Sequence, residues 1–178
     1  MGVNMESRRI KALLVDGYNL IYAHPALSGL LKSDLGAARE GLLRELAPLA
    51  SPDAYDLVMV VFDAARYGGA ETAWEEREGL TVVFTRRRQT ADSFIEAAAR
   101  RMVTAGEVVV ATSDRLLRGV VEGFGAKGLD GGSLFFLASE ERERMREEMK
   151  RVAGPGRRPL EERVSEEIRE LLDRMRYG

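Results

Sequence analysis

Residues 12–19 read Ala12-Leu13-Leu14-Val15-Asp16-Gly17-Tyr18-Asn19. Four apolar residues are followed at once by a turn that carries a carboxylate and a carboxamide. A short apolar run bounded by turn-forming residues is typical of a buried strand. Oxygen side chains at the end of such a strand can hold a hard cation, although Asp16-Gly17 is also an ordinary turn dipeptide. The segment therefore predicts a buried strand that ends in polar groups.

The same pattern recurs along the chain. Residues 58–62 lead into Asp63, and residues 108–111 lead into Thr112-Ser113-Asp114. Apolar, β-rich runs predict strands at 10–15, 56–62, 80–85, 107–111 and 133–137, and helical patterns lie between most of them. Apolar strands that alternate with helices predict an α/β fold, with a mostly parallel sheet of about five strands and helices on both faces. The polar segment 67–79 fits this scheme poorly, and we expect a loop there with one short helix at 70–77.

Composition narrows the classes of function. The 178 residues include no cysteine and one histidine, and the net charge is −2. Without cysteine, disulfides, thiolate zinc sites and cysteine nucleophiles are excluded, and a reducing, cytoplasmic location is expected. No apolar run approaches the ~18 residues of a membrane span, so no membrane association is expected. The slightly acidic balance means that nucleic-acid contacts must come from local arginine clusters.

The C-terminal part has a different character. Residues 139–178 carry 11 basic and 11 acidic side chains, and the Gly/Pro-rich segment 154–159 interrupts their helical pattern. Beyond it, an amphipathic helix is predicted whose apolar stripe is Leu160, Val164, Ile168, Leu171 and Met175. We therefore expect a domain over residues 1–153, followed by a linker and a C-terminal helical extension over residues 154–178.

Acidic residues follow the predicted strands. In an open parallel sheet, ligands bind at the carboxyl ends of the strands, where Asp16, Asp63 and Asp114 would lie. Asp92 and Glu96 share one face of the helix that follows residues 80–85. Carboxylates this close repel one another unless a divalent cation neutralises them, and oxygen ligands favour Mg²⁺ or Mn²⁺. Such a site predicts a phosphodiester substrate.

Each acid also has a purely structural interpretation. Asp92 and Asp114 are favoured in the first turn of a helix by the helix dipole, with Thr90 and Ser113 as candidate caps. The sequence motifs of common nucleotide-binding and acyl-hydrolase sites are absent. The chain has no Gly-x-x-x-x-Gly-Lys-Ser/Thr loop, no Gly-x-Gly-x-x-Gly after its first strand and no Gly-x-Ser-x-Gly elbow. The recurrence of acids at strand ends and helix starts favours the shared metal site.

Four motifs in order carry a resemblance to a known family. They are residues 16–19 (Asp-Gly-Tyr-Asn), 61–64 (Val-Phe-Asp-Ala), 90–96 (Thr-Ala-Asp-Ser-Phe-Ile-Glu) and 111–114 (Ala-Thr-Ser-Asp). Over about residues 10–138 the chain resembles the NYN domains of the PIN-like nuclease superfamily, in particular the YacP-like bacterial branch. The resemblance implies a Rossmann-like PIN fold for residues 1–153 and Mg²⁺- or Mn²⁺-dependent endoribonuclease activity. It also implies RNA as substrate and the translating ribosome as a setting.

The resemblance assigns roles to individual residues. It makes Asp16, Asp92 and Asp114 the metal-binding catalytic core. Asn19, Asp63 and Glu96 are expected to support that core, and Thr112 and Ser113 to orient Asp114 or contact a phosphate. One departure is Gln89, which stands where an acid is expected before the Thr90 motif.

Arginines near these motifs are candidate RNA contacts. Arg86, Arg87 and Arg88 lead into the Asp92 helix, and guanidinium groups there can hold flanking phosphates. Arg115 and Arg118 follow Asp114 and are candidates on the same ground. Tyr18 can stack on a base or pack beneath its loop. For all of these arginines a solvated surface is the alternative.

The predicted function is a metal-dependent endoribonuclease that cleaves single-stranded RNA, such as mRNA, by metal-activated water. The alternative is a non-catalytic RNA- or ribosome-binding module with a degenerate acidic site. A second alternative is a toxin-like nuclease held by an antitoxin, which would make the stripe from Leu160 to Met175 a partner surface.

Overall fold

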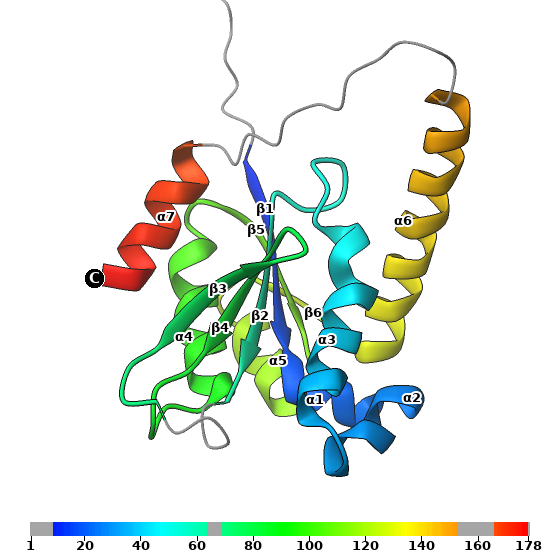
Figure 1. Cartoon of the computed structure of the whole chain (residues 1–178). Helices are drawn as coiled ribbons and strands as arrows, with labels where there is room; N and C mark the ends of the chain where they lie inside the picture. The colour runs from blue at the N-terminus through cyan, green and yellow to red at the C-terminus, as the bar shows by residue number, and fades with distance from the viewer. Residues whose placement is uncertain (1–8, 64–68, 153–165, 178) are drawn as a thin grey trace, which may run out of the picture.

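A six-stranded sheet forms the centre of the molecule (Figure 1). The computed structural model describes residues 9–63, 69–152 and 166–177. The strand order is β3-β4-β2-β1-β5-β6, and every neighbouring pair is parallel except β3 and β4. The strands are β1 (Ile10–Asp16), β2 (Leu57–Phe62), β3 (Ala73–Arg77), β4 (Leu80–Phe84), β5 (Gly106–Ala111) and β6 (Lys127–Leu129). The predicted mostly parallel α/β sheet is thus confirmed.

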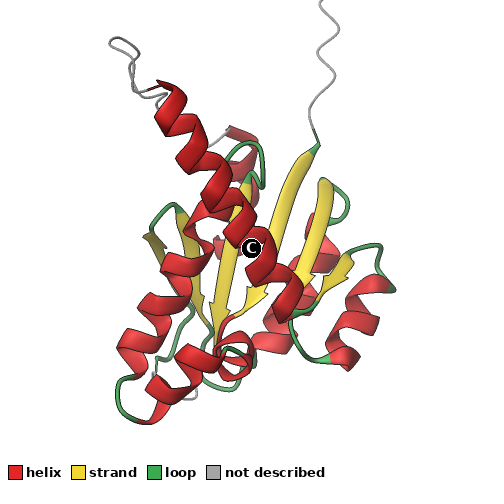
Figure 2. Ribbon diagram, turned by 90° about the vertical axis from the view of Figure 1, so that its right-hand side faces the viewer, coloured by secondary structure: helices red, strands yellow, loops and turns green. Residues whose placement is uncertain are grey.

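Helices cover both faces of the sheet, as predicted, and Figure 2 shows the long helix α6 in front of the strands. The helices are α1 (Gly17–Ala23), α2 (Pro25–Ser28), α3 (Leu35–Leu46), α4 (Ala91–Met102), α5 (Arg115–Glu122), α6 (Gly131–Val152) and α7 (Glu166–Tyr177). Two short 3-10 segments, Gly29–Lys32 and Ala47–Leu49, flank α3. None of the described helices is both long and apolar enough to cross a membrane.

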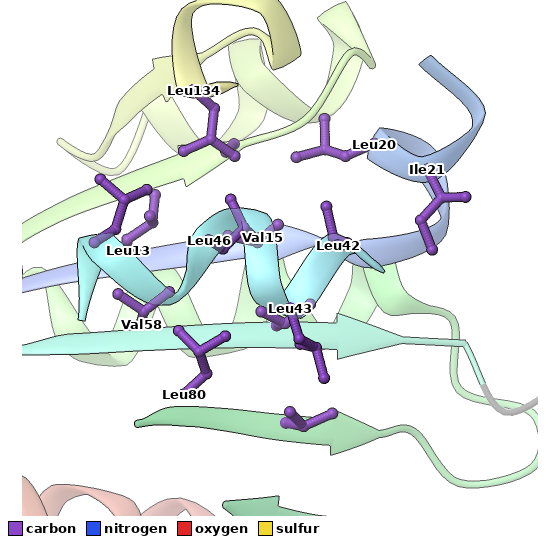
Figure 3. Packing of buried hydrophobic residues seen from close by; sticks show 14 of the residues in the cluster. Leu13, Val15, Leu20, Ile21, Leu42, Leu43, Leu46, Val58, Leu80 and Leu134 are labelled. Atoms are coloured by element: carbon purple, nitrogen blue, oxygen red, sulfur yellow. The ribbon is translucent and has the colours of Figure 1, made fainter. Parts of the chain in front are cut away.

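The alternation of side chains along β1 divides the core into two clusters. Leu13 and Val15 face α1, α3 and α6, whereas Ala12 and Leu14 face α4, α5 and α7. Figure 3 shows the first cluster, where leucines of α1 and α3 pack over β1 and β2. Because β1 is buried on both faces, its apolar run needs no polar alternation.

The predicted strand at 133–137 is wrong, because these residues belong to α6. Asp130 accepts hydrogen bonds from the backbone N–H and the hydroxyl of Ser133, at 2.9 and 3.0 Å, and so starts a helix. Leu134 and Ala138, four residues apart, are fully buried, whereas Phe136 is 62% exposed. The burial therefore repeats with a helical period. The last strand is β6, a three-residue segment with no apolar signal.

The expected helix at 70–77 is also wrong. Residues 73–77 form β3, an antiparallel edge strand that pairs Ala73 with Phe84 and Arg77 with Leu80. Glu78 and Gly79 both have positive φ, at 53° and 75°, as a two-residue hairpin turn requires. The hairpin extends the sheet beyond β4 and brings Trp74 close to α4.

The C-terminal helix packs on its own domain. Ile168 and Leu171 are only 4% and 7% exposed, and they join the core cluster that contains α4 and α5 residues. The predicted linker 154–159, together with Leu160 and Val164, lies outside the described residues. The described part of the apolar stripe is therefore covered by this chain itself, which argues against the antitoxin surface expected for a toxin-like nuclease.

Candidate functional site

The carboxyl ends of the three central strands bring the acidic motifs together. In the sheet register, Asp16 of β1 lies beside Val61 of β2, and Val15 lies beside Ala111 of β5. Asp63 therefore follows β2, and residues 112–114 follow β5, at the same edge. The chain passes to opposite sides of β1 when it forms β2 and β5, and such a switch point is where open α/β sheets bind ligands.

Asp16 is held in a buried position at this edge. It is 6% exposed, and its Oδ2 accepts a hydrogen bond of 3.2 Å from the hydroxyl of Thr112, which is fully buried. Burial, followed by the nearby charge of Asp92, raises the pKa of Asp16 to about 7, while the Thr112 bond acts in the opposite direction. Asp16 is thus a carboxylate poised to exchange a proton near neutral pH.

Asp92 couples the other acids to Asp16. It lies in the first turn of α4, which begins after Thr90, whose hydroxyl accepts the Ser93 N–H at 3.1 Å. Partial withdrawal from solvent, then the charges of Asp114 and Asp63, raise the pKa of Asp92. The interaction between the two carboxylates raises the pKa of Asp16 and acts to lower that of Asp92, so their titrations are linked. Four carboxylates therefore influence one another.

Hydrogen bonds fix the loop between β5 and α5. Asp114 caps α5, and its Oδ1 accepts the N–H groups of Leu116 at 2.7 Å and Leu117 at 3.3 Å. The Asp114 N–H donates to the Thr112 hydroxyl oxygen at 3.1 Å. Asn19, on α1, accepts the Ser113 N–H at 2.7 Å through its side-chain oxygen. Thr112, Ser113 and Asn19 thus position the Asp114 loop relative to Asp16.

Glu96 does not join this cluster in the structure. It lies one turn after Asp92 on α4, but its Oε1 forms a 3.3 Å salt bridge with Arg100. The structure therefore couples four of the five predicted carboxylates, and the fifth is paired with a basic neighbour on its own helix. The i,i+4 spacing that suggested a shared face with Asp92 also suits an ion pair with Arg100.

The predicted arginines occupy two loops. Arg86, Arg87 and Arg88 lie exposed between β4 and α4, where Arg88 has a φ of 73° and Thr85 donates its hydroxyl to the Gln89 carbonyl at 2.7 Å. These contacts fix the conformation of the loop that leads into α4, the helix that carries Asp92 in its first turn. Arg115 is exposed beside Asp114, and Arg118 is half-buried. Hydrogen bonds from Ser133, followed by the charge of Arg118, lower the pKa of Asp130.

Tyr18 packs beneath the site. Its ring lies 5.0 Å from the ring of Phe62, measured between centroids, and it joins the core cluster on the α1 face. Phe62 in turn stacks on Phe84 at 5.5 Å. Of the two interpretations of Tyr18, packing beneath the loop matches this environment.

The donor set fits a hard divalent cation. Asp16, Asp92, Asp114 and Asp63 offer oxygen atoms only, and burial with mutual repulsion raises the pKa of two of them. No salt bridge among the described residues neutralises Asp16, Asp92 or Asp114. In the side-chain arrangement of the structure, no group of three His, Cys, Asp or Glu residues in the described ranges is close enough together to hold a metal ion.

A groove beside the site was not predicted. It has a volume of about 710 Å³ and lies between β3, α4 and α7, with Trp74, Arg101 and Arg176 in its lining. Trp74 is the single tryptophan of the chain and stands within a polar stretch of the sequence. No sequence pattern indicates that Arg101 and Arg176 line the same groove, because they come together only through the packing of α7 against α4.

Comparisons with known proteins agree on one family. The sequence model of the YacP-like NYN domain matches residues 13–177, so the match includes α7. The chain is 37% identical over 115 residues to the uncharacterized protein YacP of Bacillus subtilis strain 168. That alignment covers 64% of this chain and 66%, slightly less than two thirds, of the relative.

Solved structures give the same result. A crystal structure of a variant of Rae1 (YacP) from Bacillus subtilis superposes with a TM-score of 0.66 at 30% identity, covering 90% of this chain and 91% of the other. A second crystal structure of Rae1 (YacP) also gives 0.66, at 31% identity over 80% and 82% of the two chains. The agreement over nearly the whole chain confirms the PIN-like fold.

Proposed function

This chain belongs to the YacP-like NYN domain family, a nuclease-type family, and from that premise we propose that it is a metal-dependent endoribonuclease acting on single-stranded RNA. The observation that carries the proposal is the coupling of Asp16, Asp92, Asp114 and Asp63 at one sheet edge. A cluster of repelling carboxylates lowers the stability of a fold unless it binds something positive. Perturbed carboxylates in such a place are typical of a catalytic site.

Asp16, Asp92 and Asp114 would hold Mg²⁺ or Mn²⁺, with Asp63 in support. When bound, such a cation lowers the pKa of water and neutralises charge on phosphate oxygens. The chain's own residues contribute orientation. Thr112 holds the Asp16 carboxylate, and Asn19 holds the Ser113 backbone, so the two sides of the switch point keep their spacing.

Arginines around the acids would bind the phosphates that flank the cleaved bond. Arg86, Arg87 and Arg88 lie in the loop that leads to Asp92, and their side chains are exposed. Hydrolysis by water does not use the ribose 2′-hydroxyl as nucleophile, so the choice of RNA rests on the family and not on the reaction chemistry. Cleavage of a matched DNA strand measures that preference.

The test is a cleavage assay on labelled single-stranded RNA with Mg²⁺ or Mn²⁺. We expect cleavage that stops in EDTA and falls by about 100-fold or more in Asp16→Asn and Asp114→Asn. Asp173→Asn, the same chemical change at an exposed position of α7, is the matched control and should cleave normally. Activity that survives EDTA and both site variants would refute the metal site.

A non-catalytic RNA- or ribosome-binding module predicts a different result. Such a module binds RNA without cleaving it, shows no specific effect of divalent ions and keeps its RNA affinity after Asp92→Asn. Asp16, Asp92 and Asp114, which no salt bridge among the described residues neutralises, favour the nuclease, because a binding module has no use for repelling carboxylates.

We also propose the ribosome as the setting of cleavage, on the basis of the resemblance to the YacP-like branch. Cosedimentation of the Asp114→Asn protein with purified ribosomes tests this, since the variant should leave mRNA intact. Binding that is absent at physiological salt would remove the ribosome from the proposal and leave the nuclease untouched.

A further inference from the structure

The groove between β3, α4 and α7 is lined by several arginines. Arg86, Arg101 and Arg176 line it, and Glu71 is the one acid among its lining residues. The chain as a whole carries a net charge of −2. The groove is therefore a local positive surface on a slightly acidic protein, which is the electrostatic pattern that attracts a polyanion.

The groove arginines are not held in ion pairs with acidic side chains of the described residues. No salt bridge in the described part of the chain engages Arg86, Arg101 or Arg176. Five other arginines do pair with acids, namely Arg77, Arg100, Arg142, Arg144 and Arg146. On α4, Arg100 forms a salt bridge with Glu96, whereas the adjacent Arg101 lines the groove and forms no salt bridge with a described residue.

Aromatic rings accompany these charges. The Trp74 ring packs edge-on against Phe94 at 5.8 Å, and the Arg176 guanidinium lies over it, 5.4 Å from its centroid. Tyr177, next to Arg176, is 81% exposed at the groove. Aromatic rings and guanidinium planes are the surfaces on which unpaired bases stack. A duplex keeps its base faces covered, so this combination suits a single strand.

The groove reaches the loop that leads to the acidic cluster. Arg86 and Gln89 line it, and the loop that carries them, together with Arg87 and Arg88, ends at the start of α4. Asp92 lies in the first turn of that helix, on the side away from the groove-lining residues Phe94 and Arg101. At 1.5 Å per residue, Arg101 lies about 14 Å along the helix from Asp92. A strand that lies along α4 in the groove would pass the arginine loop and the start of the helix to reach the acids on the other side.

We propose that this groove binds single-stranded RNA on one side of the cleavage site, with α7 as part of the substrate-binding surface. Arg86, Arg101 and Arg176 contact phosphates, and a base stacks against Tyr177 or the Trp74–Arg176 pair. The proposal rests on the proposed function for its substrate, but binding can be measured without cleavage.

Trp74 allows a direct test, because it is the only tryptophan in the chain. We expect a mixed-sequence single-stranded RNA, titrated in EDTA, to change the Trp74 fluorescence saturably, and duplex RNA of equal length to change it much less. Each lost phosphate contact should reduce the salt slope by about 0.7, which is about a fivefold loss of affinity at 0.1 M salt. Arg101→Gln and Arg176→Gln should each show this loss.

Matched controls lie on the same helices. Arg100→Gln on α4 and Arg169→Gln on α7 remove the same charge outside the groove and should bind RNA like the wild type. Thermal unfolding of all four variants verifies that each is folded. RNA binding without a change in Trp74 fluorescence, equal losses in the groove and control variants, or no RNA binding at all would each overturn the groove proposal.

The two proposals can fail separately. If the wild type cleaves RNA with Mn²⁺ and the groove variants cleave like the controls, the groove proposal fails and the nuclease stands. If the wild type binds RNA through Trp74 and the arginines but never cleaves it, the groove stands and the nuclease fails. Tyr177→Leu, tested by fluorescence anisotropy, separates stacking from charge attraction, because it alters no charge and should still weaken binding about fivefold or more.

Discussion

The hydroxyl of Thr112 donates a hydrogen bond of 3.2 Å to the carboxylate of Asp16, across the ends of two neighbouring strands. The same oxygen accepts the N–H of Asp114 at 3.1 Å. One buried hydroxyl thus links the acid that ends β1 to the acid that begins α5. The geometry of the site depends on this oxygen.

Thr112→Val tests that dependence, since valine keeps the shape and removes the hydroxyl. We expect a loss of about 1–3 kcal/mol of unfolding free energy, because the Asp114 N–H and the Asp16 carboxylate both lose a partner. The bond acts to lower the pKa of Asp16, so its removal should move the acidic limb of the pH–rate profile to higher pH. Urea unfolding and RNA cleavage measured against pH give the two readouts.

Two substitutions serve as controls for Thr112→Val. Thr112→Ser keeps the oxygen and should keep the pH–rate profile. Thr81→Val removes a buried hydroxyl that donates to Glu76 at 3.0 Å, far from the acids, and should cost stability without moving the profile. A profile that shifts equally in Thr81→Val and Thr112→Val would contradict a positioning role for Thr112.

Gly17 is required by the packing of the first turn after Asp16. A Cβ atom on Gly17 would overlap the ring of Phe62, which is fully buried and packed between Tyr18 and Phe84. Gly17→Ala should therefore cost about 1–3 kcal/mol of stability. It should also lower cleavage, because α1 carries Asn19.

Gly29→Ala is the matched control for Gly17→Ala, since a Cβ atom there meets nothing within 4 Å. Its φ of −63° suits alanine, so the change should be neutral or slightly stabilising. Thermal unfolding compares the two variants. Equal melting temperatures would show that the Phe62 ring can move aside.

The docking of α7 should contribute to global stability. Leu171 is 7% exposed and packs with residues of α4 and α5, so Leu171→Ala should cost about 2–3 kcal/mol. Glu170→Ala, an exposed position of the same helix, should cost less than about 0.5 kcal/mol. Urea unfolding measures both. A Leu171→Ala variant as stable as Glu170→Ala would mean that α7 leaves the domain in solution.

The sequence predicted those elements whose burial follows directly from local pattern. Strands β1, β2, β4 and β5 are apolar along most of their length, and the acids that follow the central strands could be predicted because parallel strands finish at one edge. Residues 133–137 were misassigned because their four consecutive apolar residues hide a helical period, in which Leu134 is fully buried and Phe136 faces solvent. Periodicity needs a longer window than such a run provides.

Edge and long-range features escaped prediction for a different reason. Strand β3 reads Ala-Trp-Glu-Glu-Arg, and as an edge strand it carries charges that resemble a loop. The pairing of Glu96 with Arg100, instead of its approach to Asp92, depends on side-chain rotamers. The groove depends on the packing of α7 against α4 and β3, and no local pattern encodes a contact between segments about 100 residues apart.

The raised pKa of Asp16 makes stability depend on pH. In the folded chain this pKa is about 7, whereas the ordinary value is 3.8, so between these values the folded state holds a proton that the unfolded state lacks. Unfolding free energy must therefore fall as pH rises through this window and level off above about 7, by up to about 4 kcal/mol in total. The raised pKa of Asp92 acts in the same direction.

Urea unfolding in EDTA between pH 5.5 and 8.5 checks this expectation. Carboxylates with lowered pKa, such as Glu141, are ionised in both states throughout this range and do not obscure the slope. Asp16→Asn should remove most of the slope and should be more stable than the wild type at pH 8, because the amide carries no charge to bury.

Added Mn²⁺ completes the test. A cation must displace the proton on Asp16, so it should stabilise the wild type strongly at pH 8, weakly at pH 5.5, and hardly at all in Asp16→Asn. If the wild type is insensitive to pH in EDTA, or if Asp16→Asn is the less stable protein at pH 8, then burial and repulsion do not act on Asp16 as described. If instead the slope appears but Mn²⁺ leaves it unchanged, the acids repel one another without binding a cation, and the proposed nuclease loses its metal.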